Sequence, residues 1–186
     1  MLDTEPLWYH PGRMRTLRRL QRLDRRLYQR VVSTGTPALD PYTPAFVQAT
    51  DNMVPWFLIS STLSLTGPPR LRRTALRAIL AAGVANTASS VLKNLFRRPR
   101  PDSSAVPSER FPYRTYLSSS FPSGHTAAAV GFAAGVALDA PRSLNVLVGG
   151  LAAAVAASRV PSGVHSPGDA LGGAASSMAT QRPRLE

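Results

Sequence analysis

The sequence predicts an all-α fold, a helical bundle of about five core helices preceded by a basic amphipathic helix. Two observations lead to this prediction. Near the N-terminus, apolar residues recur with the period of a helix, and beyond it apolar blocks alternate with short segments rich in proline and arginine. The 186 residues suffice for one core, and the absence of cysteine excludes disulfides, zinc–thiolate sites and a cysteine nucleophile.

The first expected element is a basic amphipathic helix over residues 13–32. Its apolar residues recur at three- and four-residue steps, and eight arginines fill the remaining faces. Such a helix suits the interface of an anionic membrane, and it suits equally the surface of the domain. The connector over residues 33–51 contains several prolines and is expected to hold a short helix near Phe46. We therefore divide the chain into this helix and connector, residues 1–51, and a helical domain, residues 52–186.

Five apolar blocks are the expected core helices, over residues 53–66, 75–92, 126–138, 144–157 and 170–179. A membrane-spanning helix needs about 20 apolar residues, and shorter segments can equally be buried core helices. The second block is the best single span, and small residues in the blocks allow close helix packing in lipid or in a soluble bundle. The pattern favours a membrane-embedded, multi-pass protein of the cell membrane with at most five spans. A soluble bundle is the alternative.

The chain is strongly basic, with a formal net charge of +12 and 21 arginines beside a single lysine, Lys93. Such a charge fits nucleic acid, an anionic membrane surface or an acidic substrate. Nothing in the sequence is typical of a base-reading module, so nucleic acid is not an expected partner. No signal peptide is expected, because the first apolar block begins only near Met53. The charge therefore indicates a membrane surface or an anionic substrate.

Three polar clusters interrupt the apolar blocks, each at the end of an expected helix. The first runs from Lys93 to Pro101, where two prolines force an extended exit and fix the direction of Arg100. The second, residues 122–125, reads Pro-Ser-Gly-His. Its Ser123 is a candidate N-cap, and the free N–H groups of the helix that follows form an anion site.

The third cluster spans residues 158–169, beginning Ser-Arg and ending His-Ser-Pro-Gly-Asp. Pro167 suits a first helical turn, which places Asp169 close to His165. Structural readings also exist, because Arg159 can cap a helix C-terminus and a His…Asp pair four residues apart is commonly a surface contact. However, two of the three histidines and the only lysine of the chain lie in these clusters.

The three clusters together resemble the signature of the type-2 phosphatidic acid phosphatase (PAP2) superfamily. The pattern is Lys, six residues, Arg-Pro; then Pro-Ser-Gly-His; then Ser-Arg, five residues, His, three residues, Asp. Every position is filled here, and the resemblance covers about residues 52–180. Each piece alone is weak evidence, whereas three pieces in order at fixed internal spacing are specific. The segment before them resembles that of small actinobacterial members.

The resemblance implies a metal-independent phosphatase that needs no cofactor. It implies that His165 is a nucleophile forming a phosphohistidine, that Asp169 orients it, and that His125 is the general acid and base. The residues implied to bind phosphate are Lys93, Arg100, Ser123, Gly124 and Arg159. The implied substrate is a lipid-linked phosphomonoester or diphosphate: phosphatidate, phosphatidylglycerol phosphate, polyprenyl diphosphate, or a polyprenyl-phosphoryl sugar phosphate of cell wall biosynthesis. The implied partners are this lipid and the membrane, and a homo-oligomer is compatible with the sequence.

Other functions stay open. A soluble acid phosphatase or a vanadate-binding haloperoxidase shares such a pocket, although the chain is short for the peroxidase. A basic membrane scaffold with a relic site is disfavoured because no signature position is missing. A metal site of His125, His165 and Asp169 is disfavoured because three nearby cations would repel a divalent ion. Four further arginines either extend the positive field of the site or are solvated surface charges: Arg97, Arg98, Arg110 and Arg114.

Overall fold

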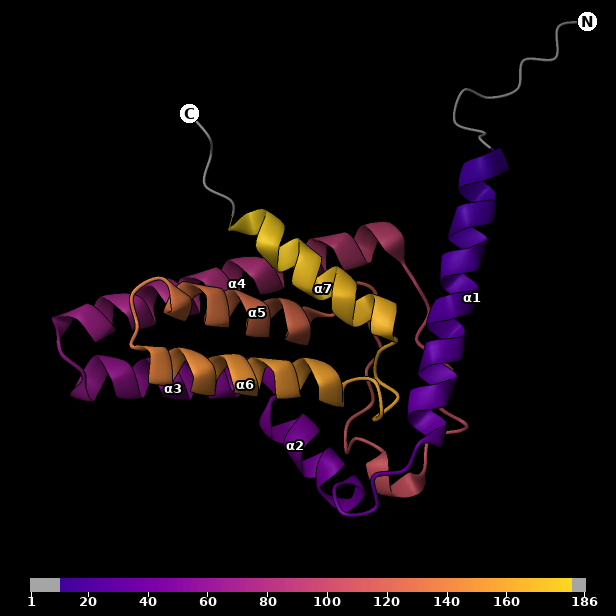
Figure 1. Ribbon diagram of the computed structural model, residues 1–186, viewed down its shortest axis with the longest axis horizontal. Helices are drawn as coiled ribbons and strands as arrows, with labels where there is room; N and C mark the ends of the chain where they lie inside the picture. Colours follow the sequence, from indigo (N-terminus) through magenta and orange to yellow (C-terminus); the bar gives the residue numbers. More distant parts are fainter. Residues whose placement is uncertain (1–10, 182–186) are drawn as a thin grey trace, which may run out of the picture.

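The computed structural model describes residues 11–181 of the chain (Figure 1). Within this range all regular elements are helices: α1 (Pro11–Ser33), α2 (Thr43–Ala49), α3 (Val54–Thr66), α4 (Pro69–Phe96), α5 (Gly124–Ala137), α6 (Arg142–Ser158) and α7 (Pro167–Thr180). Short 3-10 helices lie at Asp40–Tyr42, Asp51–Met53 and Ser108–Arg110. The all-α prediction is confirmed. Both ends of the chain lie outside the described residues, and the division at residue 51 stays a prediction.

Prolines set several of the helix boundaries, as the punctuation of the sequence predicts. Pro69 begins α4 and Pro167 begins α7, at first-turn positions where the missing N–H costs no hydrogen bond. The expected short helix near Phe46 is α2. The expected core helices agree with the structure to within three residues, except that α4 begins six residues earlier and ends four later than the block over 75–92. The first turns of α4 lie before the apolar block and carry three exposed arginines, so the apolar pattern did not predict them.

The body of the bundle consists of α3, α4, α5 and α6, which run alongside one another (Figure 1). α7 packs against α4 and α5. α1 stands across one end of this body, at a steep angle to the long helices (Figure 1). At that end α4 and α6 finish and α5 and α7 begin, so the three polar clusters of the sequence are brought to one place.

The core is built largely from small residues. Ala78 and Ala82 are fully buried, next to the ring pair of Trp56 and Phe132, whose centroids are 5.0 Å apart. A Cβ on Gly135 would lie 2.6 Å from the Cα of Ala78, so glycine is what lets α5 approach α4. The large apolar side chains instead face outward along the body: Leu58, Leu65, Leu76, Leu80, Val84, Val91, Val146, Leu147 and Leu171. Small residues inside and large ones outside reverse the usual distribution of a soluble domain.

Among the described residues, α4 is the one helix long and apolar enough to cross a membrane. α5 and α6 are apolar but shorter, with 14 and 17 residues. A single helix of this kind also occurs as a core helix of soluble proteins, so it does not by itself establish a span. The multi-pass arrangement with up to five spans therefore stays a prediction.

Arg110 has a structural role. The sequence alone suggests instead that it extends the positive field of the site or is a solvated surface charge. Its side chain is only 1% exposed, and its guanidinium donates hydrogen bonds to the carbonyls of Val32 and Thr34 and to Asp40. A buried guanidinium needs such acceptors to offset the loss of water. Arg110 therefore joins the end of α1 to the loop between α4 and α5, and the prediction of a solvated surface charge is wrong here.

Candidate active site

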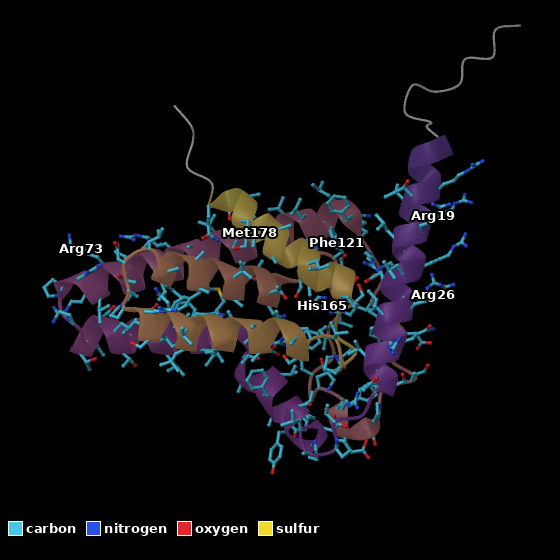
Figure 2. The ribbon with its side chains drawn as sticks, in the orientation of Figure 1. Arg19, Arg26, Arg73, Phe121, His165 and Met178 are labelled. Atoms are coloured by element: carbon cyan, nitrogen blue, oxygen red, sulfur yellow. The ribbon has the colours of Figure 1, made fainter. Side chains whose placement is uncertain are left out.

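The three polar clusters meet at the end of the bundle that α1 crosses (Figures 1 and 2). The first cluster follows α4, the second opens α5, and the third connects α6 to α7. Backbone hydrogen bonds join them: the N–H of Ser123 donates to the carbonyl of Asp169 at 2.9 Å, and the N–H of Ser120 donates to the carbonyl of Arg98 at 2.9 Å. The sequence thus brings together residues from four helix ends.

His165 lies just before α7 and is fully buried (Figure 2). Its Nδ1 is 3.7 Å from Oδ2 of Asp169, which is longer than a hydrogen bond but within ion-pair range. Neither ring nitrogen has a hydrogen-bond partner among the described residues. Burial lowers the pKa of His165 to about 4; Asp169 opposes this effect and the positive Arg100 adds to it. The imidazole is therefore neutral at neutral pH and keeps the lone pair that a nucleophile needs.

The carboxylate of Asp169 is held in place by the N-terminal cap of α7. Ser166 is the N-cap, and its N–H donates to Oδ2 of Asp169 at 2.8 Å, while the N–H of Asp169 donates to Oγ of Ser166 at 3.3 Å. Arg98 donates from NH1 to Oδ1 of Asp169 at 3.0 Å. Because His165 precedes the helix, its pair with Asp169 is a buried cap contact and not a surface contact within α7.

The start of α5 lies against the lysine of α4. Ser123 is the N-cap of α5, as expected, with its Oγ accepting from the N–H of Thr126 at 3.4 Å. A Cβ on Gly124 would lie 2.9 Å from Oδ1 of Asn86 and 3.8 Å from Nζ of Lys93. The glycine therefore allows the first N–H groups of α5 to approach Lys93, and this arrangement suits an anion.

Asp51 completes the site, and no cluster in the sequence analysis contains it. Its carboxylate accepts hydrogen bonds from Nε2 of His125 at 2.8 Å, the hydroxyl of Tyr116 at 2.6 Å and NH1 of Arg159 at 3.0 Å. Burial raises the pKa of Asp51, but the hydrogen bonds from His125 and Tyr116 and the charge of Arg159 outweigh it and lower the pKa to about 2. Burial and the neighbouring Asp51 raise the pKa of Tyr116 to about 12. Asp51 is therefore ionised, and it fixes the ring of His125, whose centroid is 6.3 Å from that of His165.

The backbone around Asp51 is strained. Asn52 and Met53 both adopt left-handed conformations, with φ of 53° and 62°, which residues other than glycine rarely do. This turn aims Asp51 into the site at the point where α3 begins. The available signal was the polar run Thr50-Asp51-Asn52 directly before an apolar block, the same pattern that marks the other clusters.

The two arginines expected to bind phosphate have different surroundings. Arg100 donates to the carbonyls of Tyr116 and Val164 and to the hydroxyl of Ser118, all uncharged acceptors. Arg159 is fully buried and donates from NH1 to Asp51 and from NH2 to Oγ1 of Thr50 at 2.5 Å. Arg159 therefore does more than end α6: it forms a buried ion pair with the carboxylate that holds His125.

A cavity of about 200 Å³ opens at the site. Four of the expected site residues line it: Lys93, Arg100, Gly124 and His125. The other four are buried and do not line it: Ser123, Arg159, His165 and Asp169. Asp51, Tyr116 and Arg114 also line this cavity. A neighbouring cavity of about 490 Å³ shares Lys93, Arg100 and Tyr116 and adds Arg97 and Arg98.

Residues 11–181 contain no group of three or more histidine, cysteine, aspartate or glutamate side chains placed to hold a metal ion. His125, His165 and Asp169, the expected alternative ligands, are not grouped in that way. What surrounds the two histidines is a set of cations and two carboxylates, Asp51 and Asp169. The arrangement suits binding of an oxyanion beside a neutral imidazole.

Comparison with known proteins shows which family has this architecture. The family described as the PAP2 superfamily matches residues 74–182, which is more than half of the chain and includes all three clusters. The chain belongs to the PAP2 superfamily. The resemblance inferred from the clusters is thereby confirmed, and so is the prediction of a phosphatase. Asp51 and α1 lie outside the matched residues of this PAP2 superfamily member.

Two solved structures have a similar fold. LpxE of Aquifex aeolicus is 22% identical, with a TM-score of 0.68 over 84% of this chain and 91% of that one. A transmembrane PAP2 type phosphatidylglycerolphosphate phosphatase from Bacillus subtilis is 22% identical, with a TM-score of 0.64 over 90% of each chain. At this identity the likeness establishes the fold. No match was found among curated proteins.

Proposed function

We propose that this PAP2 superfamily member is a lipid phosphatase in which His165 is transiently phosphorylated. One observation carries the proposal. Lys93 and Arg100 line one cavity with His125, and Arg100 also donates to the carbonyl of Val164, directly before the neutral, buried His165. Among the described residues neither cation has a carboxylate within ion-pair distance. Two cations left without a counter-charge match the two negative charges of a phosphomonoester.

The proposed first step is attack by Nε2 of His165 on phosphorus. Nδ1 of His165 faces Asp169, so we assign its proton there and leave the lone pair of Nε2 free. The N–P bond forms as the P–O bond to the lipid breaks, and the departing oxygen takes a proton from His125, which must be the doubly protonated imidazolium in this step because its other N–H is held by Asp51. Asp51 holds Nε2 of His125, which leaves its Nδ1, an atom with no hydrogen-bond partner among the described residues, to transfer that proton.

The second step returns the enzyme to its starting state. A water molecule gives a proton to His125 and its oxygen attacks phosphorus, which breaks the N–P bond and releases inorganic phosphate. Lys93, Arg100 and Arg159, together with Ser123 and the N–H of Gly124, would hold the phosphoryl oxygens through both steps. Because His165 and Arg159 are fully buried, substrate binding requires a rearrangement of the residues that cover them.

A lipid substrate is supported by the outer surface of the bundle. Its large side chains face outward over an apolar body, and this surface is suited to the acyl interior of a bilayer. The second cavity, with Arg97 and Arg98, provides room and charge for the rest of an anionic head group or for a second phosphate. The candidate substrates are phosphatidate, phosphatidylglycerol phosphate, a polyprenyl diphosphate and a polyprenyl-phosphoryl sugar phosphate. The alternative is a soluble acid phosphatase, which would be extracted without detergent.

The test is phosphate release from these four lipids and from a water-soluble phosphomonoester, at neutral pH with EDTA present. We expect the wild type to be active on at least one lipid and unaffected by EDTA. His165→Ala should be inactive, and His125→Ala should be about 10² to 10⁴ times slower. Rapid quenching with a radiolabelled substrate should give an acid-labile label on the wild type and none on His165→Ala. Equal phosphate release by wild type and His165→Ala would exclude His165 as the nucleophile, and inactivity of the wild type on every lipid would favour the scaffold.

A further inference from the structure

Asp24, a residue of α1, is connected to the carboxylate behind the proposed nucleophile. Its Oδ1 accepts from the N–H of Gly168 at 2.7 Å, and its Oδ2 accepts from NH2 of Arg98 at 2.5 Å. The same guanidinium donates from NH1 to Asp169 at 3.0 Å. A Cβ on Gly168 would lie 3.0 Å from Oδ1 of Asp24, so the glycine allows this close approach. Two ion pairs that share Arg98 therefore join α1 to Asp169 and, through it, to His165.

One side of α1 packs on the bundle end. Asp24, Tyr28 and Val32 follow one another at four-residue steps, and the latter two are buried. The hydroxyl of Tyr28 donates to the carbonyl of Asp102 at 3.0 Å, and Tyr28 and Val32 form a small cluster with Val106 and Val160. This side fixes the position of α1 against the loops that carry the site.

The neighbouring side of α1 is apolar and exposed. Leu20, Leu23, Leu27 and Val31 recur at three- and four-residue steps and are 56%, 53%, 44% and 37% exposed. The opposite side carries exposed arginines: Arg15, Arg18, Arg19, Arg22, Arg25, Arg26 and Arg30. Figure 2 shows Arg19 and Arg26 projecting from α1 on the side away from the bundle. An exposed leucine stripe beside a row of arginines is the composition of a helix that lies in an anionic lipid interface.

The direction of α1 agrees with this surface. α1 crosses the end of the bundle, and its N-terminal end extends past the bundle in Figure 1. In a bundle whose long helices cross a bilayer, a helix in this direction lies in the plane of the membrane, with its leucine stripe available to the lipid. The positive charge of the arginine row favours anionic lipid at about 1 kcal/mol for each basic residue near the surface.

We infer that α1 binds an anionic lipid surface and that Asp24 is a positioning residue. Through its ion pair with Arg98, Asp24 couples the position of α1 on the lipid to the position of the Asp169 carboxylate. The part of this inference that concerns catalysis rests on the proposed function. The part that concerns lipid binding does not. Asp24 touches no reacting atom, and it acts by fixing the guanidinium that orients the Asp169 carboxylate beside His165.

Lipid binding is tested with single-cysteine variants, because the natural chain contains no cysteine. Leu27→Cys and Arg26→Cys each carry an environment-sensitive fluorophore on the full chain, in nanodiscs of phosphatidylcholine with or without phosphatidylglycerol. We expect the label at position 27 to shift to the blue in the anionic discs and to be quenched by lipids spin-labelled near the head group. The label at position 26 should stay in water. Equal, water-like emission from both labels in anionic discs would overturn lipid binding by α1.

The coupling is tested on the same discs with a water-soluble phosphomonoester. In anionic discs Asp24→Asn should lower kcat between about tenfold and a hundredfold, with less than about a twofold change in KM, because it misplaces a supporting group without touching the substrate. Asp24→Glu should recover part of the loss, and Glu109→Gln, which removes an exposed carboxylate of the short helix Ser108–Arg110, is the matched control that should behave as wild type. The wild type should turn over faster in anionic discs, and Asp24→Asn should lose this difference.

Three results would speak against the inference. Wild-type kcat and lipid dependence in Asp24→Asn would show that Asp24 positions nothing. A lower unfolding temperature with unchanged kcat of the folded protein would show a purely structural role. If the wild type hydrolysed no substrate at all, the proposed function would fail together with the coupling, and that outcome differs from an active wild type with an unaffected Asp24→Asn.

Discussion

Replacing Asp51 by asparagine tests how the second histidine of the site is held. The substitution keeps the shape of the side chain and removes its charge. In the structure the carboxylate accepts from His125, Tyr116 and Arg159, and its own side chain is only 7% exposed. An asparagine oxygen can accept some of these hydrogen bonds, but it leaves the fully buried guanidinium of Arg159 without its counter-charge.

The magnitude follows from the pKa of Asp51. Lowering this pKa from 3.8 to about 2 corresponds to about 2 kcal/mol of stability at neutral pH, at about 1.4 kcal/mol for each pKa unit. Removing one partner of a buried ion pair typically costs about 3 to 5 kcal/mol, which sets the upper limit. Because the folded-state pKa is lowered, the stabilisation is complete above the ordinary pKa and is lost as the pH falls toward about 2. At pH 3 we expect roughly half of the neutral-pH difference between wild type and Asp51→Asn.

The assay is denaturant unfolding in detergent micelles, monitored by tryptophan fluorescence in a Trp8→Phe background, so that the signal comes from Trp56. This residue is 1% exposed and lies just after the Asp51 turn. Glu109→Gln removes an exposed carboxylate and is the matched control, with no change expected. The reasoning is refuted if Asp51→Asn is as stable as wild type at pH 7, or if its loss of stability is the same at pH 7 and pH 3.

Two further predictions concern the nucleophile and its cations. The pKa of His165 is lowered to about 4, so its active neutral form persists on acidification. The acidic limb of the pH–rate profile that is due to this residue should therefore lie near pH 4 and not near pH 6.5. If a limb near pH 6.5 is observed and disappears in an otherwise active His125 variant, that limb belongs to His125. Arg159→Lys should lower kcat/KM by about tenfold to a hundredfold, because an ammonium cannot replace the two guanidinium hydrogen bonds to Asp51 and Thr50. As a control, Arg97→Lys in the neighbouring cavity should change kcat/KM by less than about threefold.

The helices could be predicted from the sequence because their determinants are local. Apolar blocks and the prolines between them placed the core helices to within three residues, apart from α4. The three clusters were found for the same reason, since the spacing within each is short and fixed. Ser123 caps α5 and Ser166 caps α7 through contacts three residues long. Such contacts depend on sequence neighbours and on little else.

The residues that sequence analysis missed act over long separations. Arg159 meets Asp51 across 108 positions, and Arg98 meets Asp24 across 74. No periodicity or short spacing links such partners, and only the packing of α1 and of the α3 start onto the bundle end brings them together. Asp51 and Asp24 also lie outside the residues matched by the family. The signature therefore locates the two histidines and Asp169, while the N-terminal part of the chain supplies Asp51, which holds His125, and Asp24, which pairs with Arg98.

The two halves of the site have the same design. His165 faces Asp169, which pairs with Arg98, and His125 is held by Asp51, which pairs with Arg159. With His165 neutral, Asp51 is paired with Arg159, and Asp169 shares Arg98 with Asp24. Among the described residues Lys93 and Arg100 have no carboxylate within ion-pair distance, so the charges of these two cations are available to a ligand. A phosphate dianion bound between Lys93 and Arg100 would supply the counter-charge that these two cations lack, and it would reach His165 only once that buried imidazole becomes accessible from the cavity.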